Sequence, residues 1–405
     1  MGSVNFLDKL LSGAGVEWVP LKSMADIGTG SSNRQDESES AIYPFYVRSK
    51  NVLSSDTFEF DEVAIIIPGE GGIGDIFHYA EGKYALHQRA YRISITSDVV
   101  NTKFLYHFMR SSFKQYILMK SVGATAISIR KPMIEGFLIP IPCPDNPKKS
   151  LEIQAEIVRI LDAFTELTAE LNAELTARKK QYNCYRDQLL SFEQRDVAWK
   201  PLGEIGEFIR GRRFTKADYV EDGISVIHYG EIYTRYGVFT THALSQVKRE
   251  MADSLRYAEP GDVVITDVGE TVEDVGKAVA WLGDGKVAIH DHCYAFRHAM
   301  NPKFVSYCMK TASFIAEKAK YVARTKVNTL LINGFAKISI PVPYPDDLEK
   351  SLTEQARIVA ILDKFDALTH SITEGLPREI DLRQKQYAYY RDLLLSFPKP
   401  EEVAV

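Results

Sequence analysis

The chain has 405 residues, a length that accommodates two or three domains with buried cores. Hydrophobic residues make up 45% and charged residues 25%, a globular composition that excludes a disordered or fibrous protein. The 49 Lys and Arg against 54 Asp and Glu leave a net charge of −5, so total charge gives no indication of a nucleic-acid partner. Apolar runs stay below the roughly 20 residues of a membrane span, and charges interrupt the N-terminal segment, unlike a secretory signal. We therefore expect a cytoplasmic protein that binds no membrane.

The predicted elements begin with short strands at residues 63–67 and 84–95, which are β-rich and bounded by Gly, Pro and Asp. Between them, residues 69–74 read Gly-Glu-Gly-Gly-Ile-Gly and formally match the dinucleotide-binding pattern, which requires a helix to follow. A short, turn-bounded segment follows instead, and this predicts a hairpin turn. A helix is predicted over residues 103–119, so this part of the chain is expected to form a mixed α/β domain.

A proline-rich passage at residues 139–144 separates this domain from a long helix, because proline is excluded from helix interiors. Beyond it, apolar residues recur at intervals of three and four, which predicts one amphipathic helix from about residue 150 to 192. Its buried stripe includes Ile157, Leu161 and Phe164. At 1.5 Å per residue, this helix would be roughly 60 Å long.

The same order of elements returns in the second half of the chain. Strands are predicted at residues 262–266 and 287–296 and a helix at residues 303–322. A second amphipathic stripe then carries Ile358, Leu362 and Phe365. Here the run Gly375-Leu376-Pro377 predicts a kink or break in the helix.

This return reflects an internal duplication. Residues 139–168 match residues 340–369 at 18 of 30 positions, and residues 181–192 match residues 386–397 at 9 of 12. The offset grows from 201 to 205 between the two matches, so the second copy has gained four residues. Weaker matches, such as Trp18-Val-Pro-Leu and Trp199-Lys-Pro-Leu, extend the repeat over a whole domain and its helix.

The duplication predicts an α+β fold with pseudo-twofold symmetry. It contains two tandem mixed α/β domains, at residues 1–147 and 196–348, and two long helical regions, at residues 148–195 and 349–405. One narrow apolar stripe on each helix favours pairing of the two helices as an antiparallel coiled coil. The predicted pairing residues are Ile157, Leu161, Phe164, Ile358, Leu362 and Phe365.

Residue patterns that indicate catalysis or metal binding are sparse. The four cysteines form no C-x-x-C pair, which argues against a zinc site or a disulfide framework. In the cluster His290-Asp291-His292-Cys293, adjacent strand residues face opposite sides, so hydrogen-bonded histidines and a buried cysteine are favoured over a metal site. Nucleotide-binding, metalloprotease, esterase and amino-methyltransferase motifs are missing. We therefore predict no catalytic residues, no metal and no cofactor in this chain.

Two alternatives stay open at this point. The triplets Glu81-Gly82-Lys83 and Asp284-Gly285-Lys286 are similar to nuclease active sites, although each carries glycine at a turn. A self-sufficient DNA nuclease is therefore one alternative, and a protein scaffold that reads no bases is another.

Local charge is more informative than total charge. Residues 208–216 and 318–326 each carry four cations and no anion, and further cations are scattered through the first domain. Such clusters bind phosphate through Coulomb attraction and counterion release, although an isolated cluster is more often a solvated surface. Their occurrence in both copies favours phosphate binding. The candidates are Arg89, Arg92, Arg130, Arg210, Arg212, Arg213, Lys216, Arg324 and Lys326.

The repeated motifs resemble those of the specificity subunits of type I DNA restriction–modification systems. The resemblance covers nearly the whole chain and is carried by the two Trp-x-Pro-Leu openings, the Ile-Pro-x-Pro exits, the Gln-Ala-x-Ile-Val-x-Ile-Leu-Asp helix starts and the Leu-Leu-Ser-Phe ends. A short tandem repeat in the central helix is similar to that of the IC subgroup, with Asn172 as a small departure. Its residues are Thr168, Ala169, Glu170, Leu171, Asn172, Ala173, Glu174 and Leu175.

The resemblance implies that the two mixed domains are target-recognition domains, each reading one half of a split site in double-stranded DNA. The paired helices would act as a spacer and dock two modification subunits, to which restriction and translocase subunits are added. S-adenosylmethionine, ATP and Mg²⁺ are then expected on these partners. Polar residues after the first strand of each domain are the base-reading candidates, because their donors and acceptors suit base edges. They are Arg48, Ser49, Lys50, Asn51, His228, Tyr229 and Glu231.

Overall fold

A computed structural model describes residues 11, 13, 15–38, 41–72, 74–121, 128–192, 196–324, 327–371 and 374–398. The chain divides into two compact units. Unit 1 comprises Met1–Glu170 with Ile380–Val405, and unit 2 comprises Leu171–Glu379. In the described ranges, no helix combines the length and apolar character that crossing a membrane requires.

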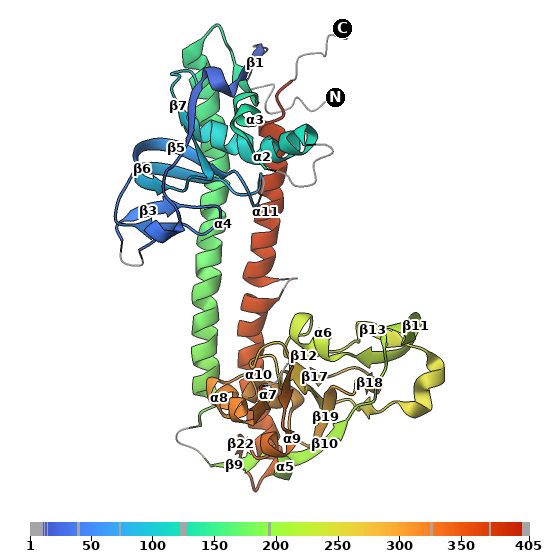
Figure 1. Cartoon of the computed structure of the whole chain (residues 1–405). Coiled ribbons are helices and arrows are strands. Elements are labelled where there is room, and N and C mark those ends of the chain that lie inside the picture. The colour runs from blue at the N-terminus through green and yellow to red at the C-terminus, as the bar shows by residue number, and fades with distance from the viewer. Residues whose placement is uncertain are drawn as a thin grey trace. The chain divides into compact units, whose positions relative to one another are not determined.

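Unit 1 is built on a six-stranded sheet with the order β2-β7-β5-β6-β3-β4 and a separate antiparallel pair, β1 and β8 (Figure 1). In chain order the strands are β1 (Val16–Pro20), β2 (Ala25–Thr29), β3 (Tyr43–Tyr46), β4 (Leu53–Ser55), β5 (Phe60–Pro68), β6 (His78–Leu86), β7 (Ala90–Ile95) and β8 (Leu138–Pro142). The helices beside them are α2 (Thr102–Lys120) and α3 (Lys131–Glu135). The strands and the helix that the sequence predicts here are confirmed.

The glycine-rich segment is the hairpin turn that its sequence predicts, not a cofactor loop. It joins the antiparallel strands β5 and β6. Gly71, Gly72 and Gly74 all have positive φ angles, between 57° and 74°, a backbone region that other residues rarely enter. Among the residues of this turn that the structure describes, no helix starts, so the feature that a phosphate-binding loop needs does not follow it.

Unit 2 holds a five-stranded sheet (β10-β19-β15-β17-β12), a four-stranded sheet (β13-β11-β18-β14), a three-stranded sheet (β16-β21-β20) and the pair β22-β9. The strands are β9 (Val197–Pro201), β10 (Gly206–Arg210), β11 (Tyr219–Ile227), β12 (Phe239–Thr240), β13 (Ser245–Val247), β14 (Tyr257–Ala258), β15 (Val263–Thr266), β16 (Val268–Gly269), β17 (Ala278–Trp281), β18 (Val287–Ile289), β19 (Cys293–His298), β20 (Val322–Ala323), β21 (Asn328–Leu330) and β22 (Ser339–Pro343). Its short helices are α5 (Leu202–Ile205), α6 (Tyr229–Thr234), α7 (Pro302–Cys308), α8 (Ala312–Lys318) and α9 (Ile332–Phe335).

The helical stretch predicted over residues 303–322 is present, but it is divided between two helices. α7 ends at Cys308 and α8 begins at Ala312. Thr311 lies between them in an extended conformation, and its hydroxyl accepts a hydrogen bond from the Phe314 N–H as the N-cap of α8. The capping preference of threonine therefore overrides the apolar periodicity that continues on either side of it.

The long helices follow the predicted pattern. α4 (Pro147–Leu189) is a continuous helix of 43 residues, close to the predicted range. Its counterpart is divided into α10 (Leu348–His370) and α11 (Gly375–Leu394), so the predicted break at Gly375 is confirmed. Both α4 and α11 pass from one unit into the other along the chain.

Pairing of the helices is visible within each unit. In unit 1, α4 and α11 lie side by side (Figure 1), and the Phe164 and Tyr390 rings stack at 5.3 Å between centroids. In unit 2, Tyr182 meets His370 at 5.5 Å and Tyr185 meets Phe365 at 5.7 Å. Residue numbers rise along α4 as they fall along α10, so the two helices are antiparallel there. The other stripe residues, Ile157, Leu161, Ile358 and Leu362, are buried in the cores of their own units.

The glutamine of each Gln-Ala-x-Ile-Val motif fastens the long helix to its domain. Gln154 is fully buried, and its Oε1 accepts a hydrogen bond from the Asn101 N–H at 2.8 Å while its Nε2 donates to the Val99 carbonyl at 2.9 Å. In the second copy, Gln355 Oε1 accepts from the Asn301 N–H, also at 2.8 Å. The duplicated motif is therefore an anchor that the two units share.

A carboxylate about two turns further along each helix completes this anchor. In unit 1, Asp162 accepts from Lys103 at 2.7 Å and lies 2.9 Å from His107 Nε2. In unit 2, Asp363 accepts from Lys303 and from the Tyr307 hydroxyl, both at 2.8 Å. The two copies differ in one partner, histidine in the first and tyrosine in the second, but keep the same arrangement.

Candidate nucleic-acid interface

Cations of the first domain gather beside the β5–β6 turn. Arg48 and Arg89 both lie with Nη1 at 3.1 Å from Glu70 Oε2, and all three side chains are largely exposed. The Gly69 backbone hydrogen-bonds to the Arg89 carbonyl at 2.9 Å and to the Ile129 N–H at 2.8 Å. This pairing brings the exposed residue Arg130, next to Ile129, to the same turn. Three candidates that are distant in the sequence, Arg48, Arg89 and Arg130, therefore lie around one turn.

The base-reading candidates of this domain occupy the loop between β3 and β4. Lys50 and Asn51 are exposed, and Ser49 is half-buried. The loop has internal support, because the Ser49 hydroxyl donates to the Asn51 carbonyl at 2.8 Å and His78 Nε2 lies 2.9 Å from the Ser49 carbonyl. The loop therefore exposes the Lys50 and Asn51 side chains, while hydrogen bonds hold its backbone in place.

The position of Arg92 argues against the phosphate contact predicted for it. Its guanidinium is only 15% exposed and bonds Asp26 at 2.5 Å and Glu62 at 3.1 Å. It also lies 4.7 Å from the centroid of the Phe60 ring. Two carboxylates already neutralise this charge inside the sheet, so Arg92 stabilises strand packing and has no free donor face for a phosphate.

In unit 2, the cationic segment after β10 is held by close backbone packing. The Gly211 N–H donates to the Cys293 carbonyl at 2.9 Å and the Arg212 N–H to the Ile289 carbonyl at 3.0 Å. A Cβ atom at Gly211 would lie 2.1 Å from the His290 carbonyl oxygen, so only glycine permits this approach. Phe214 is buried beyond it and anchors the segment from the other side.

This packing leaves the neighbouring cations exposed. Arg212, Arg213 and Lys216 all face solvent, and in the described part of the chain none of them has an acidic partner within ion-pair distance. Arg210 donates from Nε to the Asp291 carbonyl at 3.1 Å. Arg324 is exposed after β20, whereas Lys326 lies outside the described residues. Within the segment 210–216, Arg212, Arg213 and Lys216 are therefore the free cations, whereas Arg210 also lies 3.5 Å from an Asp267 carboxylate oxygen.

Beside this segment, rings from two parts of the chain, residues 228–229 and 290–292, form a cluster. His228 lies 4.7 Å from His290, and Tyr229 lies 5.3 Å from His290 and 5.4 Å from His292, measured between ring centroids. The parallel pairing of β11 with β18 causes this, because it places Ile227 opposite Ile289. Two of the three base-reading candidates of this domain, His228 and Tyr229, thus belong to one cluster.

The third candidate, Glu231, is committed to the local fold. One carboxylate oxygen accepts from the His228 N–H at 3.0 Å, and the other accepts from the Ser245 hydroxyl at 2.5 Å. With the His228 side chain accepting from the Gly230 N–H, this forms a capping box for α6. Glu231 therefore positions the cluster and has no free oxygen for a base edge.

The His290–Cys293 segment forms the internal bonds that its sequence predicts. His290 Nε2 lies 3.2 Å from the Phe214 carbonyl, and His292 Nδ1 lies 3.0 Å from Asp267 Oδ1. Burial raises the pKa of the Cys293 thiol well above its usual value. Among the residues that the structure describes, no group of three or more His, Cys, Asp or Glu side chains is arranged to hold a metal ion.

Burial also makes two histidines of unit 2 acid-sensitive. The pKa of His298 falls to about 4, and the pKa of His290 is lowered in the same direction. Both are neutral in the folded unit at neutral pH, whereas in the unfolded chain they take up protons near pH 6.5. Their contribution to stability is therefore complete above pH 6.5 and is lost as the pH falls toward 4.

We expect this loss to appear in the pH dependence of unfolding. In urea titrations between pH 7 and pH 4.5, the free energy of unfolding should decrease with acidification. His298→Asn keeps an acceptor for the Met300 N–H and should reduce proton uptake on unfolding by about one near pH 5. An unchanged pH slope in this variant would contradict the assignment.

The triplets that are similar to nuclease motifs have structural roles. Lys83 Nζ lies 4.6 Å from the centroid of the Phe58 ring, and Lys286 Nζ lies 4.3 Å from that of Tyr257. These cation–π contacts hold both ammonium groups against aromatic side chains of their own domains. The arrangement therefore gives no support to the nuclease alternative.

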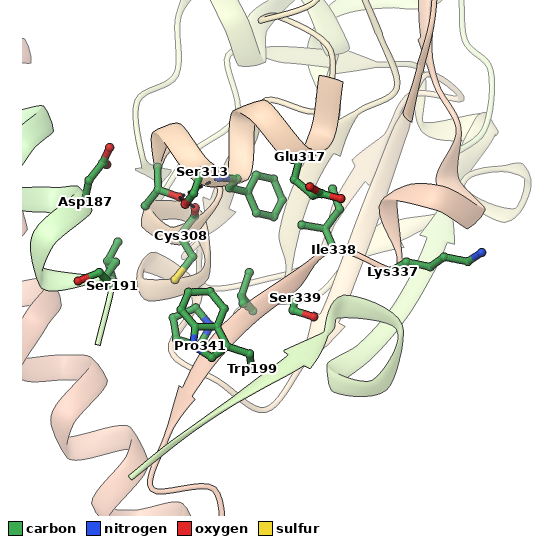
Figure 2. A pocket seen from close by; sticks show the side chains of 14 residues that line it. Asp187, Ser191, Trp199, Cys308, Ser313, Glu317, Lys337, Ile338, Ser339 and Pro341 are labelled. Carbon is green, nitrogen blue, oxygen red and sulfur yellow. Dashed lines mark hydrogen bonds between the residues drawn. The ribbon is translucent and has the colours of Figure 1, made fainter. Parts of the chain in front are cut away.

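Unit 2 contains a pocket of about 520 Å³ beside β9 and β22 (Figure 2). Trp199 is half-exposed on its wall and pairs in register with Pro341. Asp187 and Glu317 also line it, against one cation, Lys337. Since acidic groups outnumber basic ones here, this pocket does not suit a phosphate backbone.

The tandem repeat of the central helix is regular helix throughout. Thr168, Leu171 and Leu175 are half-buried, whereas Ala169, Glu170, Asn172, Ala173 and Glu174 are exposed. The Thr168 hydroxyl donates to the Phe164 carbonyl at 2.8 Å, and Glu174 pairs with Arg178 at 2.7 Å. The repeat thus keeps its apolar residues on one face at four-residue intervals.

Sequence reasoning missed three residues near the aromatic cluster: Tyr233, Asp267 and Glu270. Tyr233 lies 6.3 Å from Tyr229 between ring centroids, one turn along α6. Asp267 is buried and holds His292. The duplication contained a signal for Glu270, because Gly269-Glu270 repeats Gly69-Glu70, the site at which the first domain gathers its arginines.

Comparison with known proteins agrees with this picture of two similar units. A family model described as the type I restriction modification DNA specificity domain matches residues 14–178 and again residues 194–382. The specificity subunit of the type I restriction enzyme EcoR124I/EcoR124II of Escherichia coli is 35% identical over 426 aligned residues, which cover 100% of both chains. That of EcoprrI, also from Escherichia coli, is 29% identical and covers 92% of this chain and 93% of the relative.

A solved structure shares the fold over almost the full length. The S subunit of a type I restriction–modification system from M. genitalium aligns with a TM-score of 0.54 at 17% identity, over 96% of this chain and 97% of that one. The duplicated family match and the full-length relatives together show that the chain belongs to the family of type I restriction–modification DNA specificity subunits.

Proposed function

We propose that each recognition domain of this chain reads one half of a bipartite DNA site within a type I restriction–modification complex. The observation that carries the proposal is that both copies of the duplicated domain expose cationic side chains beside polar ones. In unit 1 the cations are Arg89 and Arg130, beside the base-reading candidate Arg48, and in unit 2 they are Arg210, Arg212 and Arg213. Such cations bind the phosphates and fix the register of the domain, while neighbouring polar groups contact base edges.

The long helices have a separate role in this proposal. They set the spacing of the two half-sites and dock two modification subunits, to which restriction and translocase subunits are added. S-adenosylmethionine, ATP and Mg²⁺ bind to those partner subunits. This chain determines which DNA sequence the complex prefers. The complex works in the cytoplasm, where the DNA is. In this proposal residues 1–147 and 196–348 are the two recognition domains, and residues 148–195 and 349–405 are the two helical regions.

Methylation sequencing tests this function directly. DNA from cells that express this chain with its modification subunits should carry methyl groups in a two-part motif with an unspecified spacer. Footprinting of the purified complex should protect both parts of that motif. Methylation without a bipartite motif would contradict the proposal, and cleavage of plasmid by the pure chain with Mg²⁺ would favour the nuclease alternative.

Arg213 gives a second, residue-level prediction. If it holds a phosphate, Arg213→Ala should weaken binding of the complex to specific and random duplexes by about the same factor. The slope of log K against log salt should fall by about one. The matched control is Arg249→Ala in the same unit, since Arg249 is exposed but already paired with Asp222 at 2.9 Å. A loss confined to one base position would contradict a phosphate role.

A further inference from the structure

A pocket of about 420 Å³ lies in unit 2 at the edge of the aromatic cluster. Tyr229 and Tyr233 of α6 line one side, and His292 and Glu270 line another. Val268 and Val327 add apolar wall. The pocket therefore combines ring faces with a small number of polar groups, the composition typical of a site for a flat, partly polar ligand.

Three polar groups of this pocket, the Glu270 carboxylate and the hydroxyls of Tyr229 and Tyr233, are available to a ligand. In the described part of the chain, no hydrogen bond or ion pair reaches the Glu270 carboxylate, and none reaches the hydroxyls of Tyr229 and Tyr233. Glu270 is exposed, and its negative charge acts on Tyr233. The Glu270 carboxylate, which lies beside two tyrosine rings, can therefore accept a hydrogen bond from a ligand.

His292 is held in a fixed orientation at the same pocket. Its Nδ1 lies 3.0 Å from Asp267 Oδ1, and Arg210 lies 3.5 Å from the other oxygen of Asp267. Asp267 is buried, so this contact fixes the ring and leaves Nε2 for the pocket. The chain Arg210–Asp267–His292 thus links the pocket to the cationic segment 210–216.

Comparison of the two copies shows what distinguishes this pocket. Glu70, the counterpart of Glu270, is held by Arg48 and Arg89 at 3.1 Å each. Glu270 occupies the same place in the duplication but has no such arginine in the described residues. In the first domain two arginines neutralise the Glu70 carboxylate, whereas in the second domain the Glu270 carboxylate is available to a ligand.

We propose that the pocket contacts a base of the second half-site that presents an exocyclic amino group in the major groove, adenine or cytosine, with Glu270 as the acceptor of its N–H. Tyr229, Tyr233 and His292 contact the base with their rings. Carboxylates accept from amino groups of base edges in the major groove, and the aromatic rings form the apolar surround of that contact. The exposed Arg212 and Arg213 hold the flanking phosphates. The inference rests on the proposed function.

The test uses the complex with its modification subunits and duplexes in which each base pair of the second half-site is replaced in turn. Glu270→Ala should reduce discrimination about tenfold or more at one position, where adenine or cytosine is preferred, and leave every other position unchanged. Tyr229→Ala should weaken binding about tenfold without changing which base is preferred. Glu250→Gln, an exposed carboxylate of the same unit, serves as the control and should behave as wild type.

The outcomes separate the pocket from the overall function. If the wild-type complex prefers its site but Glu270→Ala discriminates equally well at all positions, the pocket does not read a base. If the lost preference is for guanine or thymine, the assigned chemistry is wrong. If the wild-type complex itself shows no preference, the proposed function fails instead. Since Glu270 is exposed, matching thermal melts of variant and wild type exclude misfolding as a cause.

Discussion

Replacement of Gln154 by alanine is expected to lower the free energy of unfolding of unit 1 by about 2–4 kcal/mol. The side chain is fully buried and satisfies the Asn101 N–H and the Val99 carbonyl at once. Alanine leaves both backbone groups without a partner and opens a cavity beneath α4. Urea titration followed by circular dichroism reports the change.

The same helix supplies the control for this prediction. Glu152→Ala changes an exposed side chain two residues away and should shift stability by no more than about 0.5 kcal/mol. Gln355→Ala should reproduce the effect in unit 2, where Gln355 accepts from the Asn301 N–H. Equal stability of Gln154→Ala and wild type would show that the motif does not anchor the helix.

Deletion of Thr168–Leu171 is expected to shorten the spacer in the methylated sequence by one to two base pairs and to leave both half-sites unchanged. Four residues advance a helix by about 6 Å and rotate it by about 400°, only about 40° beyond a full turn. Base pairs are about 3.4 Å apart. The apolar face is kept, because Asn172-Ala-Glu-Leu175 then takes the place of Thr168-Ala-Glu-Leu171. Methylation sequencing of cells with the variant complex reads the result.

Deletion of Thr168 alone is the matched control for the spacer. One residue rotates the following helix by about 100°, so the half-buried positions Leu171 and Leu175 would leave the apolar face. This variant should lose methylation, whereas the four-residue deletion should retain it. Altered half-sites with an unaltered spacer in the four-residue variant would refute the role of the repeat.

The elements that the sequence predicts well are those with strong local signals. The 43-residue helix α4 carries its apolar period over its whole length, and Gly375 with Pro377 marks the break in its counterpart. The hairpin turn at residues 69–74 is equally local, since its glycines set the backbone. Even so, the cap formed by Thr311 divides a helix that periodicity alone would continue.

The candidate site is harder to predict, because tertiary pairing decides which side chains meet. No local sequence pattern predicts that His228 contacts His290, because the register of β11 with β18 brings the two residues together. Arg92 illustrates the opposite failure, since it resembles its neighbours in sequence, but Asp26 and Glu62 approach it from other strands. Charges counted along the sequence predict neither the contact between His228 and His290 nor the ion pairs of Arg92.

The shared anchor has a consequence for how such a protein changes over time. Gln154 with Asp162, and Gln355 with Asp363, meet their domains through the same backbone and lysine contacts, while the residues predicted to contact bases differ between the two domains. A recombination event that exchanged one domain for a foreign one with the same Asn-x-Lys-Phe helix start would find its attachment already in place. New sequence preferences can then arise by replacement of whole domains, without renewed selection for a stable core.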